Sequence, residues 1–558
     1  MQLKGAQILI QTLIEQGVTD VFGYPGGQVI NIYDALYEYK DKINHVLTAH
    51  EQGASHAADG YSRATGKVGV CIATSGPGAT NLVTGIATAM LDSIPMVAIT
   101  GNVPNALIGK DSFQEIDITG VTLPITKHNY FVKKVEDLAD TVREAFAIAK
   151  SGRPGPVLID IPKDVQVASC AYQPQPVVEK QPLPKVKDEK VAQAAEMIAQ
   201  AKRPYIYIGG GAAGLGMGKA LVEFAEKIDA VIGCTFMGLS AIPADAERFL
   251  GMQGMHGHYA SSMAQNEADL ILAVGVRFSD RATGNVAKFA KQSKIIQLDP
   301  DHAEINKNVR VDLGLVGDVE DAFRRIAAAC VKQENPAWLL RVNELKKEEK
   351  QFEEEIAAAD AAALTPRQVF EIINADKPAR TIVTTDVGQH QMWAAQYAQF
   401  DMPRRWVSSG GLGTMGFGLG AAMGAYVATK DPTVLITGDG SFGMNLNELA
   451  TAVTYKLPIV IVLMNNGVLG MVRQWQTLFF GKRYSNTVLD RKTDFVALAK
   501  AFGAEGYLAE TPVQFRQAFR KALQSNGPTV IDVRIDKDEF VLPMLPPGGA
   551  IDDIITKA

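Results

Sequence analysis

Two oxygen-bearing side chains stand where two neighbouring strands of a parallel sheet are expected to end. Asp439, in GDGS (438–441), directly follows the apolar run VLIT, and Asn466 closes the pair Asn465-Asn466 after PIVIVLM. Ligands of doubly wound sheets bind at the carboxyl ends of the strands. Mg²⁺ is usually held by one or two protein oxygens together with substrate phosphates, and glycines let a phosphate approach the backbone. This spacing predicts a magnesium and phosphate site, whereas GDG alone is most often a simple turn.

Ten short runs rich in Val, Ile and Leu supply the strands that this site needs, and they alternate with segments of helix length. Strands that are apolar on both faces and separated by helices are typical of doubly wound parallel sheets. The chain has 558 residues and a mass of 60.0 kDa. That is several times a domain of ~150 residues, so we expect several such sheets. The expected strands are 68–73, 95–100, 157–161, 205–208, 270–276, 294–298, 381–385, 434–437, 458–464 and 529–533.

Two breaks divide the chain into three expected α/β domains. The segment 173–190 is rich in proline, which favours an extended linker over a helix or a central strand. The charged stretch 341–355 predicts a solvated helix that bridges two domains. We therefore expect domains at residues 1–168, 190–335 and 365–558.

The composition excludes several classes of function. With 55 Lys and Arg against 61 Asp and Glu, the net charge is −6, so no broad basic surface for nucleic acid is expected. The longest apolar run, 458–464, is too short to span a bilayer, and the N-terminus has no pattern of a targeting signal. The four cysteines are scattered, which predicts neither a disulfide framework nor a zinc site. We expect a cytoplasmic protein that binds neither membrane nor nucleic acid.

The GDGS and Asn-Asn pattern resembles the cofactor motif of thiamin-diphosphate enzymes. This resemblance implies that Asp439 and Asn466 bind Mg²⁺ together with the main-chain carbonyl of Val468. It also implies a glutamate beside the cofactor's aminopyrimidine ring, and Glu51 in TAHEQGA (48–54) has a similar setting. A carboxyl group in an apolar site resists ionisation and can share a proton with the ring, whose imino nitrogen then deprotonates the thiazolium C2. The alternative for Glu51 alone is a solvent-facing residue in a first helical turn.

Further segments, spread in order over nearly the whole chain, narrow the resemblance to one family. They are VFGYPGG (21–27), AADGYSRATGK (57–67), TSGPGATN (74–81), KDSFQEID (110–117), RPGPVLIDIPKDVQ (153–166), GMHG (254–257), GVRFSDRATG (275–284), VGQHQMWAAQ (387–396), GGLGTMGFGLGAA (410–422) and LGMVRQWQ (469–476). Together they are similar to acetohydroxyacid synthase, also called acetolactate synthase. The family implies a pyrimidine-binding domain, a central FAD-associated domain and a diphosphate-binding domain. It also implies a homodimer or homotetramer with active sites between subunits, and a possible small regulatory subunit.

The resemblance also implies the residues that handle the substrates. Arg281 is suited to the carboxylate of a 2-keto acid because a guanidinium binds carboxylates in a bidentate fork; a surface ion pair is the alternative. Trp475 is implied to pack against the extra methyl group of 2-ketobutyrate, a contact of about 1–3 kcal/mol. The implied catalytic residues are Glu51, Gln114, Lys163 and Arg281, and the implied substrate contacts are Gly27, Phe113, Met255 and Trp475.

Glycine-rich segments of the third domain are implied to surround thiamin diphosphate. Met415, between glycines in GLGTMG, resembles the apolar wedge that holds this cofactor in a bent shape. The implied thiamin diphosphate contacts are Glu51, Gly388, Gln389, His390, Gly413, Met415, Gly438, Asp439, Gly440, Ser441, Asn466 and Met471.

The central domain carries a glycine pattern with two interpretations. GGGAAG (209–214), after the run YIYI, matches the dinucleotide fingerprint GxGxxG, which would indicate a nicotinamide dehydrogenase. That interpretation needs an acidic residue at the end of the next strand, near 231–235, and none is there. The family resemblance implies FAD instead, with contacts from Arg153, Gly209, Gly210, Gly211, His256, Gly275, Arg277, Asp299 and Asp318.

The predicted reaction follows from the resemblance. The enzyme decarboxylates pyruvate and joins the remaining two-carbon unit to a second 2-keto acid. Pyruvate as acceptor gives 2-acetolactate and 2-ketobutyrate gives 2-aceto-2-hydroxybutyrate, the first common step towards valine, leucine and isoleucine. The alternatives are an FAD-independent catabolic acetolactate synthase, a pyruvate oxidase and a non-catalytic homologue. Gln28 and Ser279 depart from the residues usual in the family, which affects the expected shape of the substrate channel.

Overall fold

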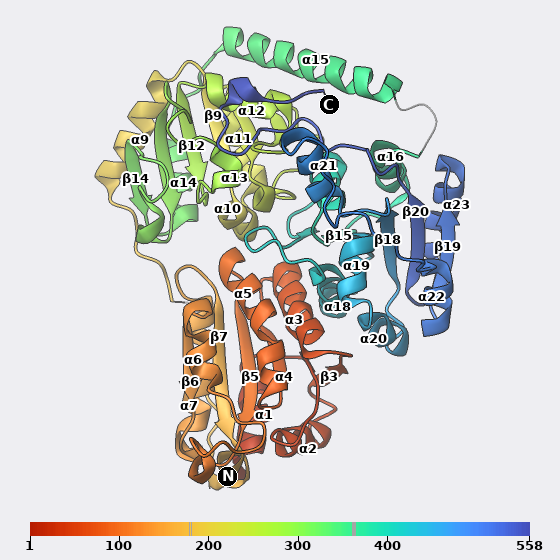
Figure 1. Cartoon of the computed structure of the whole chain (residues 1–558). Helices are drawn as coiled ribbons and strands as arrows, with labels where there is room; N and C mark the ends of the chain where they lie inside the picture. Colours follow the sequence, from red (N-terminus) through yellow and green to blue (C-terminus); the bar gives the residue numbers. More distant parts are fainter. Residues whose placement is uncertain (178, 180, 360–363, 558) are drawn as a thin grey trace.

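Three parallel sheets of six strands each dominate the computed structural model, which describes all residues except 178, 180, 360–363 and 558 (Figure 1). Both faces of a sheet are covered. In β5 (Met96–Asn102), for example, Met96 and Ala98 enter one apolar core while Val97 and Ile99 enter another. The ten expected strands are all present, and the predicted fold of three doubly wound parallel sheets is confirmed.

The first sheet has the strand order β3-β2-β4-β5-β7-β6. A short antiparallel pair, β1 (Gln2–Lys4) and β8 (Ser169–Ala171), joins the two ends of this domain. The other strands are β2 (Asp20–Gly23), β3 (Asn44–Leu47), β4 (Gly69–Ala73), β6 (His128–Phe131) and β7 (Pro156–Pro162). The helices are α1 (Gly5–Glu15), α2 (Ile30–Glu38), α3 (Glu51–Thr65), α4 (Pro77–Asn81), α5 (Val83–Asp92), α6 (Ile118–Thr122), α7 (Val135–Lys150) and α8 (Lys163–Val167).

The central sheet has the order β11-β10-β9-β12-β13-β14. Its strands are β9 (Pro204–Ile208), β10 (Val231–Cys234), β11 (Phe249–Met252), β12 (Leu270–Val274), β13 (Lys294–Asp299) and β14 (Leu313–Val316). Its helices are α9 (Asp188–Gln200), α10 (Gly210–Leu215), α11 (Gly218–Lys227), α12 (Tyr259–Glu267), α13 (Asp280–Thr283) and α14 (Val319–Ala329).

The third sheet has the order β16-β15-β17-β18-β20-β19. Its strands are β15 (Ile382–Thr385), β16 (Trp406–Val407), β17 (Thr433–Gly438), β18 (Ile459–Asn465), β19 (Glu505–Ala509) and β20 (Thr529–Arg534). Its helices are α16 (Pro366–Asp376), α17 (Gln389–Tyr397), α18 (Phe417–Thr429), α19 (Asp439–Asn445), α20 (Glu448–Thr454), α21 (Gly470–Phe479), α22 (Phe495–Phe502) and α23 (Pro512–Ala522).

These strand orders fix where ligands can bind. When the strands are numbered in chain order within each six-stranded sheet, the first and third sheets both read 2-1-3-4-6-5, and the central sheet reads 3-2-1-4-5-6. In doubly wound sheets the ligand crevice lies at the carboxyl ends of the strands, where the order reverses. That point falls between β9 and β12 in the central sheet and between β15 and β17 in the third. The glycine-rich segments after β9 and β17 therefore stand at switch points.

A long helix, α15 (Pro336–Ala359), crosses the outside of the molecule between the central and third domains (Figure 1). Trp338, Val342 and Leu345 are buried in the apolar core that includes α12, while Leu340 is exposed. The predicted bridging helix is therefore present, with one face packed and one face solvated. None of the helices in the described residues, α15 included, is both long and apolar enough to cross a membrane.

The first and third domains meet through two helices, α3 and α18, which lie side by side in Figure 1. Small residues allow their backbones to touch. A Cβ on Gly60 would lie 2.1 Å from the carbonyl oxygen of Ala421, and a Cβ on Gly424 would lie 1.8 Å from that of Ala57. Substitution of either glycine must therefore move the two helices apart at this contact.

Candidate functional site

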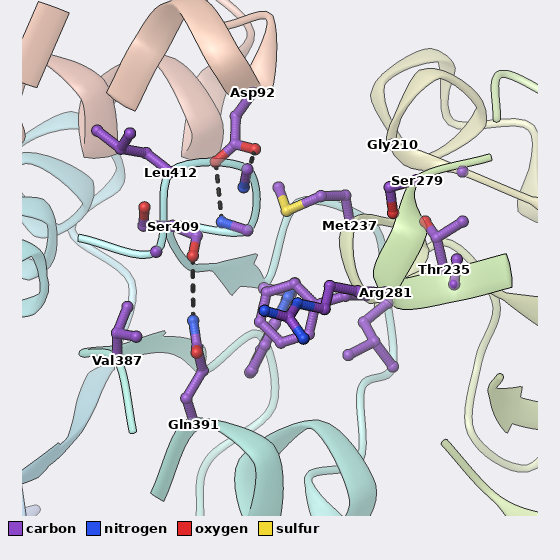
Figure 2. Close-up of a pocket in the computed structure, with 18 of the residues that line it drawn as sticks. Asp92, Gly210, Thr235, Met237, Ser279, Arg281, Val387, Gln391, Ser409 and Leu412 are labelled. Atoms are coloured by element: carbon purple, nitrogen blue, oxygen red, sulfur yellow. Dashed lines mark hydrogen bonds between the residues drawn. The ribbon is translucent and has the colours of Figure 1, made fainter. Parts of the chain in front are cut away.

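A cavity of about 1240 Å³ lies between the central and third domains and reaches the end of α5 in the first. Figure 2 shows Val387 and Gln391 of the third domain on one side of it and Gly210 and Thr235 of the central domain on the other. The segments that follow β9, β12, β15 and β17 all contribute to its wall. The cavity therefore occupies the switch points of two sheets at once.

Most of the predicted cofactor residues line this one cavity. Glu51 is the predicted thiamin diphosphate contact that does not. The lining includes all the residues predicted for FAD: Arg153, Gly209, Gly210, Gly211, His256, Gly275, Arg277, Asp299 and Asp318. It also includes the other residues predicted for the diphosphate and Mg²⁺: Gly388, Gln389, His390, Gly413, Met415, Gly438, Asp439, Gly440, Ser441, Asn466, Val468 and Met471.

The predicted metal ligands meet at one end of the cavity. Asp439 is the first residue of α19, and burial raises the pKa of its carboxyl group to about 6. The Asn466 side-chain oxygen accepts a hydrogen bond from the Val468 N–H at 3.2 Å, in a turn where Gly467 has a φ of +67°. A carboxylate and two neutral oxygens form a donor set that suits Mg²⁺. A bound cation would also offset the cost of burying the Asp439 charge.

His390 offers an unsatisfied polar atom beside this metal end. Its Nε2 is buried and has no hydrogen-bond partner among the described residues, and burial lowers the pKa of the imidazole to about 3. A Cβ on Gly438 would lie 2.7 Å from Nδ1 of this ring. Buried polar atoms are normally satisfied, so a polar ligand is expected here. A diphosphate group lying along the glycine backbone fits that space.

The central end of the cavity is also built for close backbone approach. A Cβ on Gly209 would lie 2.0 Å from the carbonyl oxygen of Gly275, so the two loops touch directly. Nδ1 of His256 is buried without a partner among the described residues, and burial raises the pKa of Asp299 to about 6. β10 ends at Cys234 and is followed by Thr235. As predicted, this strand end carries no carboxylate for a nicotinamide ribose.

A glycine-rich loop, 409–415, also lines the cavity and is held in place by residues that the sequence did not reveal. The Asp92 carboxylate accepts hydrogen bonds from the N–H groups of Gly410 (3.0 Å) and Gly411 (2.7 Å), as Figure 2 shows. Arg63 donates to the same carboxylate at 2.9 Å, and Gln391 donates to the Ser409 carbonyl at 3.1 Å. These contacts join residues more than 300 positions apart or lie outside any local motif, so no sequence pattern signals them.

The implied substrate residues of the central and third domains lie together on the cavity wall. The Arg281 guanidinium lies 5.7 Å from the centre of the Trp475 ring, and its Nη1 contacts the Met255 sulfur at 3.4 Å. Arg281 remains 61% exposed. A cation stacked on an aromatic ring and open to the cavity can receive a carboxylate.

The implied residues of the first domain form a separate group outside this cavity. Lys163 donates to the Gly27 carbonyl at 3.1 Å, and the Glu51 carboxylate accepts from the Asn81 amide at 2.9 Å. Phe113 is 84% exposed, and the Gln114 backbone lies close to Gly76, where a Cβ would be 2.9 Å from its carbonyl oxygen. Within the described part of the chain, the two groups are not brought together.

A further polar cluster, away from the cavity, had no signal in the sequence. His258, Glu349 and Glu353 have ligand-type atoms within 4.8 Å of one another. Each is already engaged: His258 Nδ1 lies 3.0 Å from Glu349, His258 Nε2 donates to the Gln396 carbonyl at 3.1 Å, and Arg367 pairs with Glu353 at 3.1 Å. We interpret the cluster as an ion-pair network that fastens α15 to its neighbours.

This network should make stability depend on pH. Burial lowers the pKa of His258, but the charge of Glu349 and the hydrogen bond to it outweigh burial and raise that pKa. A histidine whose pKa is higher in the folded state than in the unfolded state, where it is about 6.5, stabilises the folded state at pH values below 6.5. This stabilisation is lost as the pH rises through the pKa of the folded state. The difference in Tm between the wild type and Glu349→Gln should therefore be largest near pH 6 and shrink towards pH 9.

A matched control separates this effect from the loss of any ion pair on α15. Glu344 pairs with Arg341, whose charge does not change in this range, so the Tm difference for Glu344→Gln should be independent of pH. A Tm difference for Glu349→Gln that stayed constant from pH 6 to pH 9 would show that His258 is not the titrating partner.

Comparisons with known proteins agree on one family across the chain. Residues 3–121 match the family "Thiamine pyrophosphate enzyme, N-terminal TPP binding domain", residues 191–326 its central domain, and residues 386–533 its C-terminal TPP binding domain. The chain is 46% identical to the "Acetolactate synthase isozyme 2 large subunit" of Escherichia coli, covering all of both chains. It is also 46% identical to a "Probable acetolactate synthase large subunit" of Methanocaldococcus jannaschii, over 99% of this chain and 95% of the relative.

Proposed function

This chain belongs to the acetolactate synthase large-subunit family of thiamine pyrophosphate enzymes, and from that premise we propose that it is itself an acetolactate synthase. It decarboxylates pyruvate and joins the two-carbon unit to a second 2-keto acid, at the first common step of branched-chain amino-acid biosynthesis. One observation carries this proposal. A single cavity holds the predicted metal ligands Asp439 and Asn466 together with Arg281 and Trp475, which suit a 2-keto acid.

We propose that the cavity takes Mg²⁺ and FAD as well as thiamin diphosphate. Asp439, Asn466 and the Val468 carbonyl would hold the metal, with His390 beside the diphosphate. Arg153, Arg277 and the glycines after β9 would hold FAD at the central end. Bound thiamin diphosphate supplies a carbon nucleophile and an electron sink for the loss of CO₂. Because the reaction transfers no net electrons, the proposed role of FAD is structural.

The protein's own residues then divide the remaining work. Glu51 holds the proton exchanged with the aminopyrimidine ring. Arg281 binds the carboxylate of the acceptor through two parallel hydrogen bonds. Trp475 provides the apolar surface for the acceptor's alkyl group. We retain residues 1–168, 190–335 and 365–558 as the proposed domain limits.

We further propose that the complete site forms between two subunits. Glu51, Gln114 and Lys163 do not line the cavity that holds the other proposed site residues, and Phe113 is 84% exposed beside them. A second copy of the chain can bring this group to the cavity, which implies a homodimer or a homotetramer. The relatives' names specify large subunits, which supports a small regulatory partner as well.

Trp475→Leu should change the choice of acceptor. Loss of the ring removes a contact of about 1–3 kcal/mol with the additional methyl group of 2-ketobutyrate. We expect the preference for 2-ketobutyrate over pyruvate to fall about tenfold or more, measured as the product ratio at equimolar substrates.

Phe479→Leu is the matched control. Phe479 packs edge-on against Trp475, with ring centroids 5.9 Å apart, but does not line the cavity. It should leave the product ratio unchanged. An unchanged ratio in Trp475→Leu would assign the ring to packing alone.

Mass spectrometry of the products tests the proposed function. Purified protein receives Mg²⁺, thiamin diphosphate, FAD, and equimolar pyruvate and 2-ketobutyrate. Mostly 2-aceto-2-hydroxybutyrate is expected for a biosynthetic enzyme, whereas mostly 2-acetolactate would favour the catabolic type. Acetate or acetyl phosphate with oxygen consumption would identify an oxidase, and no product would indicate a non-catalytic homologue.

A further inference from the structure

Glu448, the first residue of α20, is a fully buried carboxylate to which the proposed mechanism assigns no role. Its oxygens accept hydrogen bonds from the N–H groups of Ala49 at 3.1 Å and His50 at 2.9 Å, and from the Thr451 hydroxyl at 2.7 Å. Burial raises the pKa of the Glu448 carboxyl group, whereas these three donors favour its ionised form and offset part of that cost. A side chain of the third domain therefore binds the backbone of the first domain.

The two bound residues are the ones that lead into Glu51. Glu51 is the first residue of α3, and His50 is its N-cap, whose Nδ1 accepts from the Gln52 N–H at 3.0 Å. Gly53 allows the contact, because a Cβ there would lie 2.1 Å from Glu448 Oε1. Hydrogen bonds thus hold the backbone on either side of Glu51 in place, and those accepted by Glu448 come from another domain.

A second contact of α20 lies nearby but does not touch these residues. The Tyr455 hydroxyl, just after the helix, accepts from the Leu47 N–H at 2.8 Å. Glu448 and Tyr455 both join the third domain to the connection between β3 and α3. They differ in one respect: Glu448 binds the residues adjacent to Glu51, and Tyr455 binds the end of the strand before them.

We propose that Glu448 is a positioning residue that sets the direction of the Glu51 carboxyl group. It acts through the N–H groups of residues 49 and 50 and touches neither substrate nor cofactor. The inference rests on the proposed function, because it concerns how Glu51 activates thiamin diphosphate. Misplacement of a catalytic group by about 1 Å can lower a rate about 100-fold, so a backbone anchor of this kind has a measurable effect.

Glu448→Gln tests the proposal, because glutamine keeps the shape but gives up one acceptor oxygen. In the cofactor-free protein, amide hydrogen exchange at Ala49 and His50 should become faster. In the holoenzyme, exchange of the thiamin C2 proton for deuterium, followed by NMR after acid quenching, should slow about 10- to 100-fold. The Kd for thiamin diphosphate should change less than about threefold, since Glu448 does not contact it.

Two further variants show whether the effect passes through Glu51. In a Glu51→Gln background, Glu448→Gln should slow C2 exchange no further, because residues that act as one unit are not additive. Tyr455→Phe weakens the same domain contact and should leave C2 exchange within about twofold of wild type. If Glu448→Gln fails to fold, Gly53→Ala displaces the same carboxylate and should give the same loss.

The inference is overturned if Glu448→Gln exchanges the C2 proton at the wild-type rate. It is also overturned if Glu448→Gln slows this exchange as much in the Glu51→Gln background as in the wild type, or if Tyr455→Phe slows it as much as Glu448→Gln does. Failure of the proposed function is distinguishable from these outcomes. In that case the wild-type protein itself neither forms product nor exchanges the C2 proton, and the inference fails with it.

Discussion

Replacement of Glu51 by glutamine is expected to lower turnover about 10²- to 10⁴-fold, the usual contribution of a positioned acid or base. Glutamine preserves the size of the side chain and can still accept from the Asn81 amide, which lies 2.9 Å from the carboxylate. It cannot exchange a proton with the aminopyrimidine ring. Turnover is measured by product formation, and cofactor affinity by calorimetric titration with Mg²⁺ and thiamin diphosphate.

Glu51→Gln should still bind Mg²⁺ and thiamin diphosphate, because the proposed metal and diphosphate contacts lie in the third domain. Glu136→Gln, which neutralises an exposed carboxylate in the first turn of α7, is the matched control and should behave as wild type. Near wild-type turnover in Glu51→Gln would remove Glu51 from the mechanism. Loss of cofactor binding would reassign it to a binding role.

Asp439→Ala should abolish activity by a different route, through loss of the cofactor. Asp439 is the charged member of the proposed metal ligands, and loss of even an outer partner of a metal site weakens binding about 10- to 100-fold. We therefore expect the affinity for Mg²⁺ with thiamin diphosphate to fall by at least about 100-fold. The readout is the thiamin diphosphate retained after gel filtration in Mg²⁺, and removal of Mg²⁺ by a chelator should reproduce the loss in the wild type.

Asp490→Asn, which neutralises an exposed carboxylate in the loop between α21 and α22, should retain the cofactor and serves as the control. FAD content should not change in Asp439→Ala, because the proposed FAD contacts lie at the other end of the cavity. Full retention of thiamin diphosphate in Asp439→Ala would show that the metal is held elsewhere.

Most of the buried strands could be predicted from the sequence, whereas several edge strands could not. β17 and β18 are buried along their whole length, so they read as continuous apolar runs. β3 and β6 lie at the edges of the first sheet and are partly exposed, with sequences NHVL and HNYF that carry no such signal. Edge strands gain their hydrogen bonds from a neighbour that the local sequence does not specify.

The same distinction applies to the cavity wall. The places of Asp439 and Asn466 on it could be predicted because each directly follows a buried strand, and a strand end has a known place in a doubly wound sheet. Asp92 and Glu448 could not, because their partners lie in another domain, at Gly410 and at Ala49. Local spacing reveals which residues a strand or helix presents, but it does not reveal which distant backbone they meet.

The packing of α3 against α18 relates the first domain to the third. The two helices hold the same position relative to sheets of identical strand order, because each follows the second strand, in chain order, of its six-stranded sheet. Their contacts are reciprocal, because Gly60 meets Ala421 and Gly424 meets Ala57. The same offset along the sequence takes Gly60 to Gly424 and Ala57 to Ala421. That offset also pairs Glu51 with Met415. The first and third domains therefore form an internal pseudodimer, in which the proposed proton carrier Glu51 and the proposed apolar wedge Met415 stand at equivalent positions.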